Sequence, residues 1–376
     1  MTVFGFNQYI VQGRFNDLTN STVLQLIKDS GARALLVWQW DFNRNGAKEV
    51  SNAQMVQLAN ACKQYGIELW VVLCYDPAAA KSLVAALGDL CNHYEVCKEP
   101  HISGYCSASA TLYADRWRDV VTACRQVNPN ALYGGPVSGR PTNRREWFET
   151  WLRDCADIIN PQNTFLSYHW YSHYSGSLPT QAQLIQNAKT QIPSDIAAFK
   201  QLCRSVLGYE LPVALTELNW TADPSVARWD EQEAFMTEWT NAAMNALKDV
   251  AWAAFFWNLG GVWENTMSII KPGPAYTKKP QYNAIKGFLQ QVPQPPPPPP
   301  PETISLNVTA GTGGTVSPSG SRTLTIGQAY SFKATANRRY RFSRWSGVNT
   351  STRNPLPLVA TQNMDGKSLK ATFRRR

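Results

Sequence analysis

The sequence lacks the hydrophobic signals that mark membrane-spanning and exported chains. It has no run of about 18 apolar residues, which is the length that a membrane-spanning helix needs. The first residues, Met1 to Phe6, lack the basic and apolar sections of a secretory signal. We therefore expect no transmembrane segment, and either a protein made without a signal peptide or a mature form restarted with Met.

Phosphate-binding and nucleophile-elbow motifs are also missing. A doubly wound dinucleotide-binding sheet needs a glycine-rich turn after its first strand, but the chain reads Val11-Gln-Gly-Arg-Phe15 there, with no GxGxxG. No P-loop and no GxSxG sequence occurs anywhere. These absences argue against a Rossmann-type fold, nucleotide hydrolysis and serine hydrolase chemistry.

Metal-binding patterns are scarce. The chain has only 4 His, and no HxH pair stands in the first apolar run. The 8 Cys fit no zinc ribbon and no CxxC motif, so we expect mostly buried thiols, with room for one or two disulfides among Cys91, Cys97 and Cys106. We expect neither a metal nor another cofactor.

Acidic residues are nearly absent from the end of the chain. Residues 302–376 contain 12 Lys and Arg but 2 Asp and Glu, whereas residues 1–301 contain 24 and 25. The net charge of +9 therefore belongs to the tail alone. The nearly neutral larger part suits a neutral substrate better than nucleic acid.

A proline run divides the chain. Pro293 and Gln294 are followed by seven consecutive prolines, Pro295 to Pro301, which favour a stiff polyproline II spacer. This predicts a domain at 1–292, a linker at 293–302 and a small domain at 303–376.

Upstream of the linker, β-rich apolar runs alternate with helical patterns, which is typical of parallel βα units. A capping box begins at Ser51, and Gly31 and Gly66 are helix stop signals. Eight such runs in about 290 residues predict a (β/α)₈ TIM barrel, whose chemistry lies at the C-terminal ends of the strands. The eight runs are Val3–Ile10, Arg33–Trp40, Ile67–Tyr75, His93–Cys97, Ala131–Val137, Thr164–Trp170, Pro212–Glu217 and Ala251–Trp257.

Two glutamates stand at the ends of predicted strands. Glu99 follows the fourth strand, and Glu217 ends the seventh. Two carboxyl groups that face one cleft are what the cleavage of a glycosidic bond needs, one to protonate the leaving oxygen and one to act at the anomeric carbon.

The residues around these glutamates carry a family resemblance. The stretches Tyr94-Glu-Val-Cys-Lys-Glu-Pro100, Val127-Asn-Pro-Asn-Ala-Leu-Tyr-Gly-Gly-Pro136, Leu166-Ser-Tyr-His-Trp-Tyr171 and Thr216-Glu217 resemble the clan A glycoside hydrolases. Within that clan the sequence looks most like glycoside hydrolase family 39. The resemblance implies a retaining mechanism, with Glu99 as the acid/base and Glu217 as the nucleophile.

Further site residues follow from the same resemblance. His169 and Tyr171 match the imidazole and aromatic positions near the nucleophile, where the Tyr hydroxyl would hydrogen-bond Glu217. Trp257 matches the ring under the sugar at the cleavage point. Five other Trp at or beyond strand ends predict a sugar cleft with several subsites, Trp40 and Trp220 among the substrate contacts; the five are Trp38, Trp40, Trp170, Trp220 and Trp263.

Two positions depart from the clan. Lys98 stands where the clan usually has an Asn that contacts the sugar 2-hydroxyl, and a cation there would lower the pKa of Glu99, the wrong direction for a general acid. Lys98 could instead meet an anionic substituent, or point away from the site. The Arg common on the second strand is not evident in Leu35-Leu-Val-Trp38.

The tail reads as short strands separated by Gly and Ser turns. Gly313 to Val316, Ala329 to Thr335, Tyr340 to Gly347 and Ala371 to Phe373 resemble the bacterial β-repeat module related to internalin B repeats. The resemblance implies an all-β attachment or spacing module. Its many Arg could bind an acidic polysaccharide or a cell-envelope surface, and no nucleic-acid-binding signature is present.

The sequence therefore favours a retaining glycoside hydrolase that cleaves β-glycosidic bonds of a polysaccharide or oligosaccharide. We expect a monomer that is extracellular or at the cell surface. Two alternatives are open: a catalytically weak or inactive barrel that binds carbohydrate, for which Lys98 is the motive, and a surface adhesin dominated by its tail.

Overall fold

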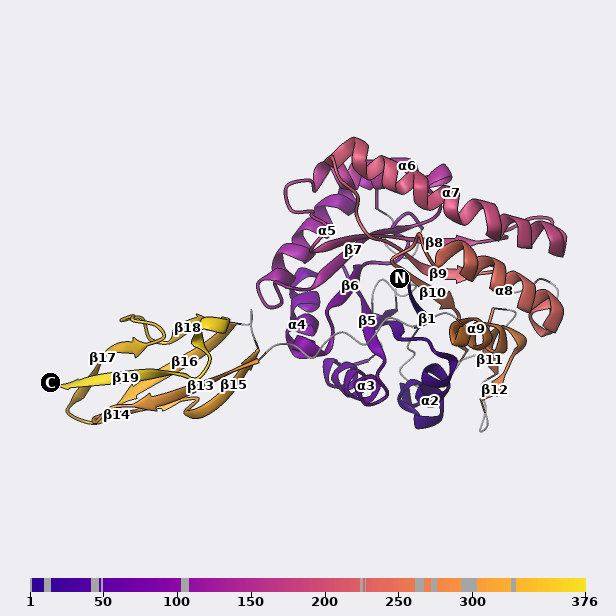
Figure 1. Cartoon of the computed structure of the whole chain (residues 1–376). Coiled ribbons are helices and arrows are strands. Elements are labelled where there is room, and N and C mark those ends of the chain that lie inside the picture. The colour runs from indigo at the N-terminus through magenta and orange to yellow at the C-terminus, as the bar shows by residue number, and fades with distance from the viewer. Residues whose placement is uncertain are drawn as a thin grey trace. The chain divides into compact units, whose positions relative to one another are not determined.

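The computed structural model shows two compact units, Met1–Gln294 and Pro295–Arg376 (Figure 1). It describes residues 2–9, 15–41, 47–48, 50–102, 108–223, 226, 228–260, 267–271, 276–291, 303–325 and 329–376. The predicted linker, 293–302, lies outside the described residues.

The first unit is a closed barrel of eight parallel strands in the order β1-β10-β9-β8-β7-β6-β5-β2. All eight predicted strands are present, so the predicted TIM barrel is confirmed. Two short hairpins, β3 (Trp40–Asp41) with β4 (Ala47–Lys48) and β11 (Ile270–Lys271) with β12 (Thr277–Lys278), are additions to it. The barrel strands are β1 (Val3–Tyr9), β2 (Ala34–Trp38), β5 (Glu68–Leu73), β6 (His93–Val96), β7 (Leu132–Ser138), β8 (Thr164–Tyr171), β9 (Val213–Asn219) and β10 (Ala253–Trp257).

Helices surround the barrel (Figure 1). Their ends follow the signals in the sequence: the Ser51 side chain and Gln54 form the predicted capping box, and Gly31 ends a helix in the left-handed conformation with φ 84°. The helices are α1 (Phe15–Thr19), α2 (Ser21–Ser30), α3 (Asn52–Gln64), α4 (Pro77–Leu87), α5 (Ala110–Arg125), α6 (Pro141–Asp154), α7 (Gln181–Leu207), α8 (Glu233–Leu247) and α9 (Pro280–Gln291). None of the helices described in the structure is long and apolar enough to cross a membrane.

Aromatic rings fill the barrel near the N-terminal ends of its strands. Trp70 stacks on His93 with ring centroids 4.4 Å apart and contacts Phe255, Trp252 and Phe165 at 4.8, 5.0 and 5.4 Å. Such pairs contribute about 0.5–1.5 kcal/mol each beyond their buried area. This end of the barrel is therefore a packed core, and the polar cluster described below lies at the opposite ends of the strands.

The second unit consists of two sheets, β15-β13-β19-β17 and β14-β16-β18, around a separate apolar core. The short strands predicted for the tail are present, and β18 is an addition that the sequence patterns missed. β18 contains Pro357 and follows Pro355; it pairs with β16 at the edge of its sheet, and an edge strand tolerates proline. The strands are β13 (Thr303–Ala310), β14 (Gly314–Ser317), β15 (Gly320–Thr325), β16 (Ala329–Ala336), β17 (Tyr340–Gly347), β18 (Leu356–Val359) and β19 (Lys367–Arg375).

Alanine substitutions at two glycines of the barrel unit should change the free energy of unfolding in opposite directions. Gly31 has φ 84° and a Cβ added to it would lie 3.0 Å from Leu289 Cβ, so Gly31→Ala should lower the free energy of unfolding by about 1–2 kcal/mol. Gly287 lies inside α9 with open space around an added Cβ, so Gly287→Ala should raise it by about 0.5–1 kcal/mol.

Urea unfolding followed by Trp fluorescence measures both changes in the barrel, because Trp345 is the only Trp after residue 302. Equal effects of the two substitutions would contradict the assignment of Gly31 as a left-handed helix end.

Candidate active site

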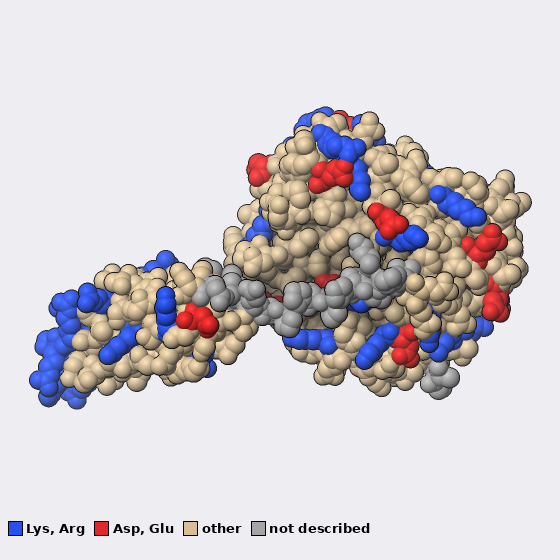
Figure 2. All heavy atoms as spheres, in the orientation of Figure 1, with Lys and Arg blue, Asp and Glu red and all other residues tan. Residues whose placement is uncertain are grey.

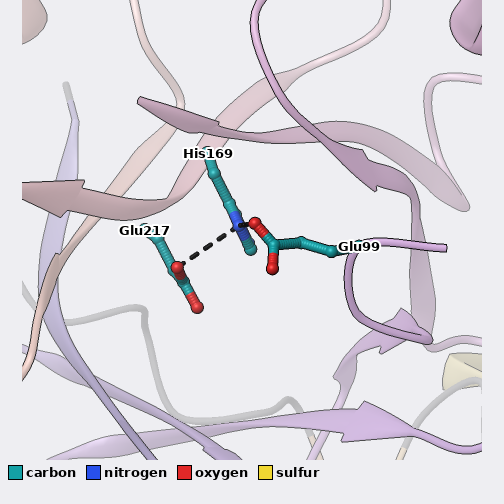
Figure 3. A group of neighbouring side chains, drawn as sticks. All are labelled: Glu99, His169 and Glu217. Carbon is teal, nitrogen blue, oxygen red and sulfur yellow. Dashed lines mark hydrogen bonds and ion pairs between the residues drawn. The ribbon is translucent and has the colours of Figure 1, made fainter. Parts of the chain in front are cut away.

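Carboxyl and imidazole groups from three strand ends meet at the C-terminal end of the barrel. Glu99 follows β6, His169 lies in β8 and Glu217 lies in β9 (Figure 3). One oxygen of each carboxylate and one ring nitrogen of His169 all lie within 4.8 Å of one another. The fold thus brings together residues that are up to 118 positions apart in the sequence.

His169 bridges the two carboxylates. Its Nδ1 lies 3.0 Å from Glu99 Oε1 and 3.3 Å from Glu217 Oε2, and the ring is almost completely buried. Burial alone would lower the pKa of His169, but the charges of Glu217 and Glu99 and the hydrogen bond to Glu99 raise it above the usual value. The two carboxyl groups therefore favour the protonated form of the ring.

Glu217 receives two further contacts. The Tyr171 hydroxyl donates a hydrogen bond of 2.6 Å to its Oε2, as the resemblance implied. Lys98 Nζ lies 2.6 Å from its Oε1, and the Lys98 and Glu217 side chains are only 6% and 4% exposed. Lys98 thus points into the site rather than away from it.

Glu99 is held by a turn of the backbone with two left-handed residues. Cys97 and Glu99 have φ of 63° and 39°. Positive φ is uncommon for residues other than glycine and is typical of constrained functional loops. Burial would raise the pKa of Glu99, but the hydrogen bond and charge of His169, followed by the charges of Lys98 and His101, lower it to about 2. Glu99 is ionised in this state of the site.

Lys98 also lies over two stacked indoles. Its Nζ is 3.5 Å from the centroid of the Trp38 ring and 4.7 Å from that of Trp257, and the two rings stack with centroids 5.3 Å apart. Trp38 Nε1 donates to Asn7 Oδ1 at 3.0 Å, and Asn7 Nδ2 donates to the Thr216 carbonyl at 2.6 Å. An indole from β2 and the Lys that follows β6 thus occupy this side of the site.

A third carboxyl lies deeper in the barrel. Glu95 of β6 is 1% exposed, and burial raises its pKa to about 7, although the charge of His169 opposes that rise. The sequence analysis does not identify Glu95 as a site residue, because it lies within a predicted strand. The strands of a parallel barrel are buried on both faces, so a Glu in the middle of one is the sequence signal for a buried carboxyl group.

The other Trp predictions have mixed outcomes. Trp257 lies beside Lys98 as described, 7% exposed. Trp220 is fully buried and stacks on Trp229 with Phe235 at its edge, so the structure does not bring it to the cluster as a substrate contact. Trp170 is also fully buried. The side chain of Trp40 and the whole of Trp263 lie outside the described residues.

The cluster does not fit a metal ion, although Glu99, His169 and Glu217 have the donor atoms and spacing for one. A metal needs a neutral imidazole, whereas the pKa of His169 is raised, and Lys98 already pairs with Glu217 at 2.6 Å. Among the described residues no other cluster of three such donors was found.

The cysteines follow the sequence reading in part. Cys97, in the turn before Glu99, is disulfide-bonded. Six others are buried thiols: Cys62, Cys74, Cys91, Cys124, Cys155 and Cys203. Cys106 lies outside the described residues.

Comparison with known proteins separates the two units. Residues 304–376 match the family model of the divergent InlB B-repeat domain, which confirms the resemblance of the tail. No functionally curated protein matches the sequence significantly.

The barrel resembles solved glycoside hydrolases in fold. A monomeric β-xylosidase from Caulobacter crescentus CB15 has a TM-score of 0.59 and 12% identity, covering 92% of this chain and 72% of that one. A family 39 glycoside hydrolase from Bacteroides cellulosilyticus WH2 has a TM-score of 0.53 and 14% identity, covering 99% and 80%. A GH39 β-xylosidase from Caulobacter crescentus has a TM-score of 0.55 and 13% identity, covering 76% and 70%. The chain therefore shares the clan A barrel with glycoside hydrolases at low sequence identity.

The raised pKa of Glu95 predicts a loss of stability with rising pH. The unfolded chain loses this proton near pH 4.5, whereas the folded barrel keeps it to about pH 7, so between these values the folded state binds one proton more and the free energy of unfolding falls as pH rises. The Gln side chain resembles a neutral carboxyl group, so Glu95→Gln should remove this pH dependence. At pH 8 the variant should have a free energy of unfolding about 3 kcal/mol higher than the wild type, relative to their difference at pH 4.5.

Urea unfolding at pH 4.5 and pH 8 measures the free energy of unfolding of wild type and Glu95→Gln. Glu68→Gln is a control of opposite sign: burial would raise the pKa of Glu68, but the hydrogen bond and charge of His93 lower it, so this variant should lose rather than gain stability at pH 8. Parallel pH profiles for wild type and Glu95→Gln would contradict the neutral state of Glu95.

Proposed function

We propose that the barrel is a retaining glycoside hydrolase that cleaves β-glycosidic bonds of a polysaccharide or oligosaccharide. The observation that carries the proposal is the separation of the two carboxylates, whose nearest oxygens lie within 4.8 Å. Retaining enzymes hold their carboxyl groups about 5–5.5 Å apart, whereas inverting enzymes need about 6.5–9.5 Å to fit a water. The β configuration of the substrate is proposed from the fold neighbours, two of which are named β-xylosidases.

The roles of the two carboxylates follow from their surroundings. Glu217 accepts contacts from Lys98 and Tyr171, which orient its carboxyl group for attack. Glu99 is 19% exposed, the most accessible group of the cluster, as a group that must reach the leaving oxygen and then a water should be. We therefore assign Glu217 as nucleophile and Glu99 as acid/base.

The proton for the first step resides on His169 in the free enzyme. The low pKa of Glu99 and the raised pKa of His169 both favour a proton on the ring, whose Nδ1 lies 3.0 Å from Glu99 Oε1. When the leaving oxygen approaches Glu99, the proton passes from His169 through Glu99 to that oxygen. Glu99 and His169 thus act together as one general acid. The low pKa of Glu99, to which His169 and Lys98 contribute, is then compatible with acid catalysis, because His169 holds the proton.

The charges balance over both steps. A Glu217 oxygen bonds to the anomeric carbon while the bond to the leaving oxygen breaks and that oxygen takes the proton. A water then replaces Glu217 on the anomeric carbon and returns a proton through Glu99 to His169. Glu99, Glu217, His169 and Lys98 carry no net charge in the free enzyme, and none in the intermediate, where Glu217 is an ester and His169 is neutral.

A second function has one observation in its favour. The Lys98 ammonium already pairs with Glu217 at 2.6 Å, and such a pair would suit a barrel that binds carbohydrate and does not cleave it. The two functions differ in what Lys98 does: it supports the nucleophile in the first and blocks it in the second.

We also propose that the protein is a monomer that works outside the cell or at its surface. The support is the B-repeat match of residues 304–376 and the disulfide at Cys97, since disulfides persist mainly in oxidising compartments.

Substitution of the carboxylates tests the proposed reaction. Glu217→Gln should lower turnover of aryl β-glycosides by about 10⁴-fold or more, because no covalent intermediate forms. Glu99→Ala should lose most activity on 4-nitrophenyl glycosides and less on 2,4-dinitrophenyl glycosides, whose leaving group needs no acid. Azide should rescue Glu99→Ala and give the β-glycosyl azide, identified by NMR.

A panel of β-xylosides, β-glucosides, β-galactosides and β-mannosides provides the substrates. Glu238→Gln, an exposed carboxyl in α8, is the matched control and should keep full activity. Turnover by Glu217→Gln at the wild-type rate would overturn the nucleophile assignment.

The sign of the Lys98→Asn effect separates the two functions. If Lys98 supports Glu217, its replacement should lower kcat/KM by about 10²-fold, as the loss of one preorganised charge contact does. If Lys98 blocks Glu217, the same change restores the residue of the resembling clan and should raise turnover. The kcat/KM of Lys98→Asn, with Lys248→Asn at the half-buried end of α8 as control, decides between them.

A further inference from the structure

The four-stranded sheet of the second unit has one buried and one exposed face. Alternate residues of β13 and β19 point into the apolar core, among them Leu306, Val308, Leu369 and Ala371. Because side chains alternate along a strand, the residues between them form the opposite face. On β17 and β19 that opposite face is basic.

Four cations form a basic strip on this face: Arg341, Arg344, Lys370 and Arg374. Arg341 lies directly opposite Arg374 across the antiparallel pair, Arg344 lies opposite Thr372 and Lys370 opposite Ser346. All four side chains are exposed. These three cross-strand pairs follow one another along the strands. Because residues on the same face of a strand lie about 7 Å apart, the three pairs extend over about 14 Å.

The strip has no internal counter-charge. The strands β13, β15, β17 and β19 contain no Asp or Glu, and none of the four cations forms an ion pair in the part of the chain that the structure describes. Asp365, the one described carboxylate of this unit, already accepts a hydrogen bond from the Ser305 amide at 2.7 Å. Figure 2 shows Lys and Arg gathered on this unit, with few acidic residues.

The Arg341 and Arg374 pair makes the strip unfavourable by itself. Like charges directly opposite each other in a sheet are destabilising. A ligand with closely spaced negative charges removes that repulsion and gains charge-assisted hydrogen bonds to guanidinium groups.

The surroundings of the strip distinguish the kind of polyanion. The neighbouring aromatic rings belong to the core side: Trp345 is fully buried, and Phe342 packs between it and Phe373 at centroid distances of 5.6 and 6.1 Å. No ring is therefore offered to nucleobases, which single-stranded nucleic acid needs for tight binding. A polymer recognised by its charges alone fits the strip better.

We propose that the basic strip binds a linear acidic polysaccharide that carries a carboxylate on most of its sugars. The flat, extended row of cations matches a chain whose charges recur along its length. This site is separate from the proposed glycosidase function of the barrel, and its ligand need not be the substrate of the barrel.

Binding of the full-length protein to immobilised polygalacturonate tests the proposal. Arg341→Ser/Arg374→Ser should weaken binding at least about 10-fold and make it less dependent on salt, because two charge contacts are lost. Lys333→Ser/Arg353→Ser removes the same charge from other exposed positions of this unit and should change binding less than about 2-fold. Unchanged thermal unfolding of both variants establishes that they are folded.

Three outcomes would overturn the proposal. These are equal loss of binding in the two double variants, no salt-sensitive binding of wild type to polygalacturonate above that to a neutral polysaccharide, or tighter binding to single-stranded DNA of equal charge. Turnover of aryl glycosides by the strip variant should equal that of wild type, so a failed glycosidase assignment leaves this test unaffected.

Discussion

The interaction on which the site depends is the imidazole of His169 held between two carboxylates. Removal of the ring would leave Glu99 and Glu217 facing each other as like charges, one of them almost fully buried. With His169 and Lys98 present, each carboxylate has a basic partner within about 3 Å. The proposed reaction depends on this arrangement, because it places a proton donor beside Glu99 and a charged partner beside Glu217.

The barrel makes this arrangement by bringing together the C-terminal ends of three strands. His169 and Tyr171 lie on β8 and Glu217 on β9, so the hydrogen bonds of the closed sheet fix their relative positions, and Glu99 lies in the turn that follows β6. Lys98, which follows β6, joins these strands to β2: its Nζ lies over the Trp38 ring and pairs with Glu217.

Much of the fold and the centre of the site could be predicted from the sequence. The eight barrel strands were visible because β-rich runs alternate with capped helices, and Glu99 and Glu217 stood at strand ends. The orientation of Lys98, its packing on Trp38 and the burial of Trp220 could not be predicted, because they depend on side-chain packing between strands far apart in the chain. Glu95 was missed for a related reason: its pKa depends on burial, which its place within an apolar run indicates only once the barrel is assumed.

The most direct measurement of the central claim is a search for the covalent intermediate. Wild-type protein is incubated with 2,4-dinitrophenyl 2-deoxy-2-fluoro-β-glycosides of the sugars that it hydrolyses, and the labelled peptide is identified by mass spectrometry. The account predicts one glycosyl adduct per chain, on Glu217. An adduct on another residue, or hydrolysis of the parent glycosides with inversion at the anomeric carbon, would contradict it.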